Sequence, residues 1–73
     1  MNMARYKMTV GKKIRSLRVL DNITQQELAD KLNVSRVVVC NWEKDKSVPN
    51  KENIKKLAEV FNCDTKVITS LII

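Results

Sequence analysis

The chain has 73 residues, which is enough for one domain and too few for two. Hydrophobic residues make up 44% of it and charged residues 30%, the balance of a folded globular chain rather than a disordered one. The longest purely apolar run, Val37-Val38-Val39-Cys40, falls far short of the roughly 18–20 residues of a membrane-spanning helix. The N-terminus lacks the apolar stretch of a signal peptide, so we expect a cytoplasmic protein without a membrane partner.

The side chains exclude most catalytic chemistry. There is no histidine, which removes the commonest general base and the commonest metal ligand. Cys40 and Cys63 are too few and too far apart for a zinc site, and a disulfide between them would need an oxidising compartment. A single glycine, Gly11, excludes a glycine-rich phosphate loop. We therefore expect no enzyme, metal, cofactor or small-molecule ligand.

The charge is concentrated at one end. The chain has 14 Lys and Arg against 8 acidic residues, a net charge of +6. Residues 1–23 hold six basic residues and one acid, so this segment alone carries +5. Such a segment suits a polyanion, either nucleic acid or an anionic membrane surface, but it is also compatible with a merely solvated basic helix face.

Apolar residues recur with helical spacing along the chain. Val10, Ile14, Leu17 and Ile23 predict a first amphipathic helix, interrupted at Asp21-Asn22. A second helix begins at the sequence Thr-Gln-Gln-Glu of residues 24–27, which is typical of a capping box. Its expected buried side chains are Leu28, Ala29 and Leu32.

Three further helices are predicted. Asn33 suits a left-handed turn, and Ser35 is a good N-cap for a third helix that reaches to about Lys44. After a loop over residues 45–49, Asn50 caps a fourth helix, and Asp64 caps a short fifth one. The apolar residues that we assign to the core faces of these last two helices are Ile54, Leu57, Ala58, Phe61, Val67 and Ile68.

One stretch opposes this interpretation. Val37, Val38 and Val39 are β-branched, which disfavours a helix by a few tenths of a kcal/mol per residue. The stretch from Arg36 to Trp42 taken alone also fits a strand. A lone strand would have nothing in this chain to pair with, so we predict an all-α fold of five helices.

The third helix has two different faces. At about 100° per residue, Val38, Val39 and Trp42 share the side that suits a core. The outward side carries Arg36, Val37, Cys40, Asn41 and Lys44. Arginine reads guanine, asparagine reads adenine, and an aliphatic side chain packs on the thymine methyl, so this set suits base recognition. An ordinary amphipathic helix would have a similar composition.

Several separated segments together resemble a known family. They are residues 24–35 (Thr-Gln-Gln-Glu-Leu-Ala-Asp-Lys-Leu-Asn-Val-Ser), 41–44 (Asn-Trp-Glu-Lys), 48–50 (Val-Pro-Asn) and 57–62 (Leu-Ala-Glu-Val-Phe-Asn). This pattern resembles the Cro/C1-type helix-turn-helix family of phage and bacterial repressors, over nearly the whole chain. The resemblance implies a lambda-repressor-like domain, with the helix-turn-helix at helices two and three. We divide the chain into a flexible basic arm, residues 1–8, and this domain, residues 9–73.

The resemblance also implies roles for individual residues. Gln25 matches a position that touches a phosphate and supports the first recognition residue. Arg18 and Glu43 match a pair that forms an internal salt bridge, which would make Arg18 structural. Together with the outward face of the third helix, the residues expected to bind DNA are Gln25, Ser35, Arg36, Val37, Cys40, Asn41, Lys44 and Lys46.

The sequence departs from the family pattern at five positions. Asn33 and Asp45 stand where glycine is usual, and Val37, Val38 and Cys40 stand where small polar residues are common. The substitutions in the third helix put the base preference in question rather than DNA binding.

The function expected from these features is sequence-specific binding of double-stranded DNA by a transcriptional regulator, in particular a repressor. The alternative is a protein-interaction module or an antitoxin whose main partner is a protein. We also expect a homodimer on two-fold symmetric half-sites, because an apolar cluster at the C-terminus has nothing left in the chain to cover it. The interface residues expected are Val67, Leu71, Ile72 and Ile73.

Overall fold

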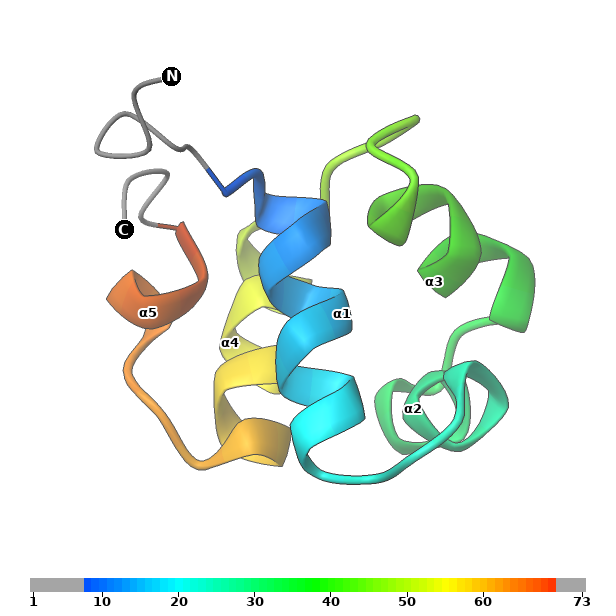
Figure 1. The fold of residues 1–73 in the computed structure, drawn as a ribbon, viewed down its shortest axis with the longest axis horizontal. Helices are drawn as coiled ribbons and strands as arrows, with labels where there is room; N and C mark the ends of the chain where they lie inside the picture. Colours follow the sequence, from blue (N-terminus) through cyan, green and yellow to red (C-terminus); the bar gives the residue numbers. More distant parts are fainter. Residues whose placement is uncertain (1–7, 70–73) are drawn as a thin grey trace, which may run out of the picture.

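The computed structural model describes residues 8–69, and within that range it contains five α-helices and no strand. Helix α1 contacts α3 on one side and α5 on the other, while α2 packs on α3 and α4 (Figure 1). The helix-turn-helix and α5 therefore lie at opposite sides of the domain, and the predicted all-α fold is confirmed. The helices are α1 (Val10–Leu20), α2 (Gln25–Leu32), α3 (Arg36–Glu43), α4 (Lys51–Phe61) and α5 (Thr65–Thr69).

Each of the first four helices begins at a side-chain cap. The oxygen of Thr9, Thr24, Ser35 or Asn50 accepts a hydrogen bond from the backbone N–H three residues later. At α2 the carboxylate of Glu27 also accepts from the N–H of Thr24 at 2.8 Å, which completes the predicted capping box. A cap of this kind stabilises a helix by about 1 kcal/mol. The sequence predicted the caps of α2, α3 and α4 correctly, whereas the Thr9 cap of α1 was not predicted.

Left-handed residues end the helices. Asn22, Asn33, Asp45 and Asn62 have φ between 54° and 60°. Asparagine and aspartate tolerate this conformation better than other side chains with a Cβ atom. The turn between α2 and α3 therefore forms at Asn33 without a glycine, as predicted.

One small core joins all five helices. Buried side chains from α2 are Leu28, Ala29 and Leu32, as predicted, and Trp42 of α3 is 3% exposed. One prediction about the core faces was wrong: Val67 is 43% exposed instead of filling the core, because Ile68 occupies the inward position of the short α5. Phe61 is partly buried and packs against the core, on the face predicted for it. The remaining core residues are Ile14, Val39, Ile54, Leu57, Ala58 and Ile68.

Gly11 allows α1 and α3 to approach closely. It is buried, and a Cβ atom built on it would collide with the backbone carbonyl oxygen of Trp42 and with the carboxylate of Asp45. Backbone atoms cannot move aside as a flexible side chain can, so the spacing of the two helices depends on glycine here. The sequence pattern alone did not predict this role for Gly11.

Some predictions concern segments outside the described residues. The expected basic arm, residues 1–8, lies outside them apart from Met8, and so do Leu71, Ile72 and Ile73. Between residues 8 and 69, no helix has the length and apolar character needed to cross a bilayer.

We expect Gly11→Ala to lower the free energy of unfolding by about 1–3 kcal/mol, because the added methyl group overpacks the crossing of α1 and α3. At an ordinary helical position the same change is stabilising by about 1 kcal/mol. Thermal unfolding followed by circular dichroism measures the difference. Ser16→Ala, at an exposed position of the same helix, is the control and should not lower the melting temperature. A Gly11→Ala variant as stable as the unmodified chain would contradict this role.

Candidate nucleic-acid interface

Helix α3 is held by its inner face and free on its outer one. Val39 and Trp42 are buried in the core, and Val38 packs partly against it. The helix follows α2 after a three-residue turn and begins at Ser35, whose Oγ accepts from the N–H of Val38 at 3.3 Å. This geometry directs the first turn of α3 outward from the domain.

The residues expected to bind DNA lie around that outer face. Ser35, Arg36, Lys44 and Lys46 are exposed, and Val37 is 59% exposed although it is apolar. The structure brings together a hydroxyl, three cations and an aliphatic group along α3 and the loop after it. The remaining members of the predicted set, Gln25, Cys40 and Asn41, are half-buried.

An ion pair ties α3 to α1. Arg18 Nε lies 2.7 Å from Glu43 Oε2, and Arg18 Nη2 lies 3.0 Å from Glu43 Oε1, so the two side chains form a fork of two parallel bonds. The third guanidinium nitrogen donates to the carbonyl of Ile23 at 2.9 Å. The side chains are 13% and 4% exposed, so the pair implied by the family resemblance is present and is largely buried.

This environment keeps Arg18 charged. The hydrogen bond to Glu43 raises the pKa of the Arg18 guanidinium above its ordinary value, and it outweighs burial, which acts in the opposite direction. Arg18 is therefore a permanent structural cation directed inward, and it is not available to a phosphate.

Gln25 joins the same group from α2. Its Nε2 donates to Glu43 Oε1 at 3.1 Å, and its Oε1 accepts from Arg36 Nη1 at 3.5 Å, the outer limit of a hydrogen bond. Three helices thus meet at the carboxylate of Glu43, and Gln25 extends the hydrogen-bonded group to the exposed guanidinium of Arg36.

A second attachment holds the end of α3. Thr9, the N-cap of α1, donates its hydroxyl proton to Asp45 Oδ2 at 2.8 Å, directly after α3. The N–H of Lys46 returns to the carbonyl of Asn41 at 2.9 Å, which closes the C-terminus of the helix. The contact between Thr9 and Asp45 was not predicted, because nothing in the local sequence pattern relates residues 36 positions apart.

We expect Glu43→Ala to destabilise the domain by about 3 kcal/mol, since removal of one partner leaves the Arg18 cation buried and unpaired. For a domain of this size that loss lowers the melting temperature by about 10 °C or more. Lys44→Ala is the control at the adjacent exposed position and should change it little. Equal melting temperatures for the two variants would refute a stabilising pair.

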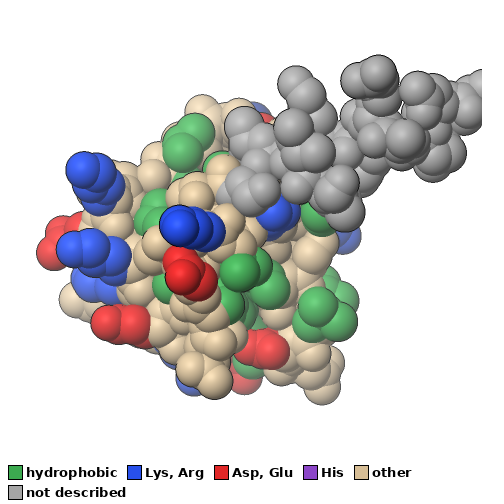
Figure 2. Space-filling view, turned by 90° about the vertical axis from the view of Figure 1, so that its left-hand side faces the viewer, with side chains coloured by type: hydrophobic (Ala, Val, Ile, Leu, Met, Phe, Trp, Pro, Cys, Tyr) green, Lys and Arg blue, Asp and Glu red, His purple; other side chains and the backbone are tan. Residues whose placement is uncertain are grey.

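The opposite side of the molecule has a different character. Figure 2 shows positive, negative and apolar side chains intermingled there, so no single sign of charge dominates that face. The extended outer face of α3 is in contrast free of exposed acids from Ser35 to Lys44.

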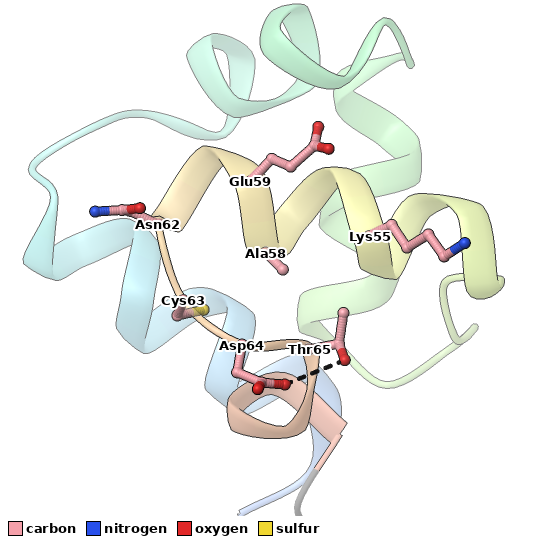
Figure 3. Close-up of a pocket in the computed structure, with 7 residues that line it drawn as sticks. All are labelled: Lys55, Ala58, Glu59, Asn62, Cys63, Asp64 and Thr65. Atoms are coloured by element: carbon pink, nitrogen blue, oxygen red, sulfur yellow. Dashed lines mark hydrogen bonds between the residues drawn. The ribbon is translucent and has the colours of Figure 1, made fainter.

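A hollow between α4 and the start of α5 is the other candidate site. Figure 3 shows Lys55, Ala58 and Glu59 on one wall and Cys63, Asp64 and Thr65 on the other. One of its two carboxylates is already used, because Asp64 Oδ1 accepts from the N–H of Lys66 at 2.9 Å and from the Thr65 hydroxyl at 3.4 Å.

The thiol of this hollow is not activated. Burial raises the pKa of Cys63, and the negative charges of Asp64 and Asp21 raise it further. The thiolate is the reactive form, so a raised pKa makes Cys63 a weaker nucleophile than an ordinary cysteine. Within residues 8–69 no three metal-binding side chains are grouped either. We therefore place the candidate functional site at α3.

Comparison with known proteins agrees with this geometry. The profile of the helix-turn-helix family matches residues 14–68, and the chain belongs to that family. The HTH-type transcriptional activator BcrR of Enterococcus faecalis is 38% identical over 55 residues, which cover 75% of this chain and 27% of that protein. The HTH-type transcriptional regulator ImmR of Bacillus subtilis is 33% identical over 58 residues, covering 80% of this chain and 46% of that one.

A solved structure shows the same fold. The P22 c2 repressor, crystallised with a synthetic operator, has a TM-score of 0.81 and 29% sequence identity, and the match covers 85% of this chain and 94% of that one. The predicted lambda-repressor-like fold and the Cro/C1-type resemblance are thereby confirmed. The chain spans between about a quarter and a half of the length of the two curated relatives named above.

Proposed function

We propose that this chain is a sequence-specific DNA-binding regulator of transcription, and in particular a repressor, that inserts α3 into the major groove of a double-stranded operator. The observation that carries the proposal is the outer face of α3, where Arg36 and Val37 are exposed on a helix anchored by the buried pair of Arg18 and Glu43. The named relatives are regulators of transcription, and the P22 c2 repressor was solved with an operator. We also propose that it acts in the cytoplasm, because the named relatives are bacterial and the DNA of a bacterium lies there.

Base recognition falls to three residues in this proposal. Arg36 reads O6 and N7 of guanine, Val37 packs on a thymine methyl, and Asn41 contacts a base edge or the neighbouring phosphate. Exposed Val37 has no role in the core, so contact with an apolar group of the DNA gives it a function.

The other expected contacts position the helix. Lys44 and Lys46 neutralise phosphates, the Ser35 hydroxyl contacts a phosphate at the start of α3, and Cys40 packs at the rim of the groove. Phosphate contacts hold all sequences alike and give binding its salt dependence. The proposal includes no catalytic step, cofactor or metal.

We expect Arg36→Ala to weaken binding to the preferred sequence tenfold or more, because a good base contact supplies about 1–3 kcal/mol of discrimination. Binding to random DNA should weaken far less. The preferred sequence is first selected from a random pool of duplexes, and affinities are then measured by fluorescence anisotropy.

Two matched variants complete this experiment. Lys66→Ala, on the distant α5, should change neither affinity, and Val37→Thr should alter the preference at one base pair without changing the salt dependence. Equal weakening of the preferred and random duplexes by Arg36→Ala would make Arg36 a phosphate contact and contradict base reading by this residue.

The proposed assembly is a homodimer through α5, with its two recognition helices about 34 Å apart on successive major grooves. The position of Val67 supports this dimer. Val67 is an apolar residue exposed on α5, and together with Met8 and Leu17 it lines a hollow whose surface is mostly apolar. Lys13 Nζ donates to the carbonyl of Val67 at 3.0 Å and so ties α5 to α1. Leu71, Ile72 and Ile73 extend the proposed interface beyond the described residues.

We expect Val67→Lys to dissociate the dimer, because it buries a cation in an apolar interface, while the exposed position leaves the fold intact. Truncation after Ser70 should act in the same direction. Sedimentation equilibrium reports the assembly state, and Lys66→Ala, at the neighbouring residue, is the control. A Val67→Lys chain and a truncated chain that both remain dimeric would rule out this interface.

A further inference from the structure

Two apolar side chains at the end of α1 are exposed and take no part in the core, the DNA contacts or the dimer proposed above. Val19 is 58% exposed and Leu20 is 80% exposed, and they are neighbours in the last turn of α1. Arg15 is also exposed, and it precedes Val19 by four residues, the spacing of neighbours on one helix surface. Adjacent exposed apolar residues commonly mark an interaction surface. We call Arg15, Val19 and Leu20 the α1 patch.

The hollow between α4 and α5 has a complementary character. Its volume is about 650 Å³, which is ample for two aliphatic side chains. Ala58, only 6% exposed, and half-buried Cys63 give it an apolar lining. Glu59 is exposed at its rim, and its carboxylate is directed away from α5 (Figure 3). The hollow therefore offers an apolar floor and an accessible negative charge, while the α1 patch offers apolar side chains and a positive charge.

The α1 patch and the hollow lie on different sides of the molecule. At about 100° per residue, Val19 is on the side of α1 away from the buried Ile14. Figure 3 looks into the hollow, and α1 runs behind α4 and α5 in that view. A chain therefore cannot place its own patch in its own hollow, and a contact between them joins two copies head to tail. Helix α3 belongs to neither surface, so each copy keeps its outer face for DNA (Figure 1).

We propose that the hollow between α4 and α5 takes the α1 patch of a second copy, and that copies on neighbouring DNA sites bind cooperatively through this contact. Val19 and Leu20 pack over Ala58, and Arg15 lies beside Glu59. The inference rests on the proposed DNA binding. The contact is heterologous, because it joins two different surfaces, and it is thus distinct from the two-fold dimer through α5.

DNA makes such a small contact effective. A few side chains bury little area, so free copies associate weakly through them. Two copies bound to one duplex are held at a high effective concentration, and a contact too weak to assemble the free protein then strengthens binding at the second site.

Duplexes that carry one or two copies of the sequence selected from a random pool test this contact. Footprinting measures the affinity of each site. At a favourable spacing, occupation of one site should strengthen binding at the other about tenfold, which is a typical coupling between two sites. The gain should rise and fall with a period of about 10 base pairs as the spacing is changed, because both copies must lie on the same side of the duplex.

Variants of both surfaces identify the partners. Leu20→Gln keeps the net charge and changes an exposed position, so it should abolish the gain on two sites while affinity for one site stays the same. Arg15→Glu should also abolish the gain, and Arg15→Glu combined with Glu59→Lys should restore it, because the two charges are exchanged. Lys56→Glu is the control for net charge, since Lys56 is an exposed cation of α4 outside the hollow, and it should leave the gain unchanged.

The outcomes separate this inference from the proposed function. Independent binding at every spacing, or a full gain with Leu20→Gln, would overturn the contact while binding to one site stands. A gain lost with Arg15→Glu and not recovered in the double variant would overturn the docking of Arg15 at Glu59. If the unmodified chain bound no single site, the proposed DNA binding would fail, and the inference with it.

Discussion

The buried ion pair between Arg18 and Glu43 is the interaction on which the placement of α3 depends. The carboxylate of Glu43, in the last turn of α3, accepts hydrogen bonds from Arg18 of α1 and from Gln25 of α2, so three helices share one charged group. A buried charge is stable only with its partners in place, which makes this arrangement close to all-or-none. The apolar core sets which face of α3 points inward, and the ion pair fixes how α3 is rotated and tilted against its neighbours.

The valine run in α3 shows how packing and recognition divide one helix. Val39 is fully buried and Val38 is partly buried, so two of the three β-branched residues have a role in the core. Val37 carries the same unfavourable helix propensity and remains exposed. A local rule that is broken without a gain in packing is typical of a functional position, and Val37 lies beside Arg36 on the outer face of the helix.

Local signals in the sequence predicted most of the fold. Side-chain caps at Thr24, Ser35 and Asn50 located the helix starts, and periodicity found the buried face of α2. Contacts between distant residues left no such signal. The need for glycine at position 11, and the closeness of Asp45 to it, became evident only once α1 and α3 were placed together. The pair of Arg18 and Glu43 was expected from the family resemblance alone. The direction of the Gln25 amide required the coordinates.

The most direct test of recognition by α3 is an NMR titration of the ¹⁵N-labelled chain with the duplex selected from a random pool. DNA in contact with α3 should change the backbone amide shifts of residues 35–41 and the side-chain signals of Gln25 and Arg36. The amides around the hollow at Cys63 and Asp64 should change little, since that hollow lies between α4 and α5. Shift changes centred on the hollow, with α3 unaffected, would contradict recognition through α3.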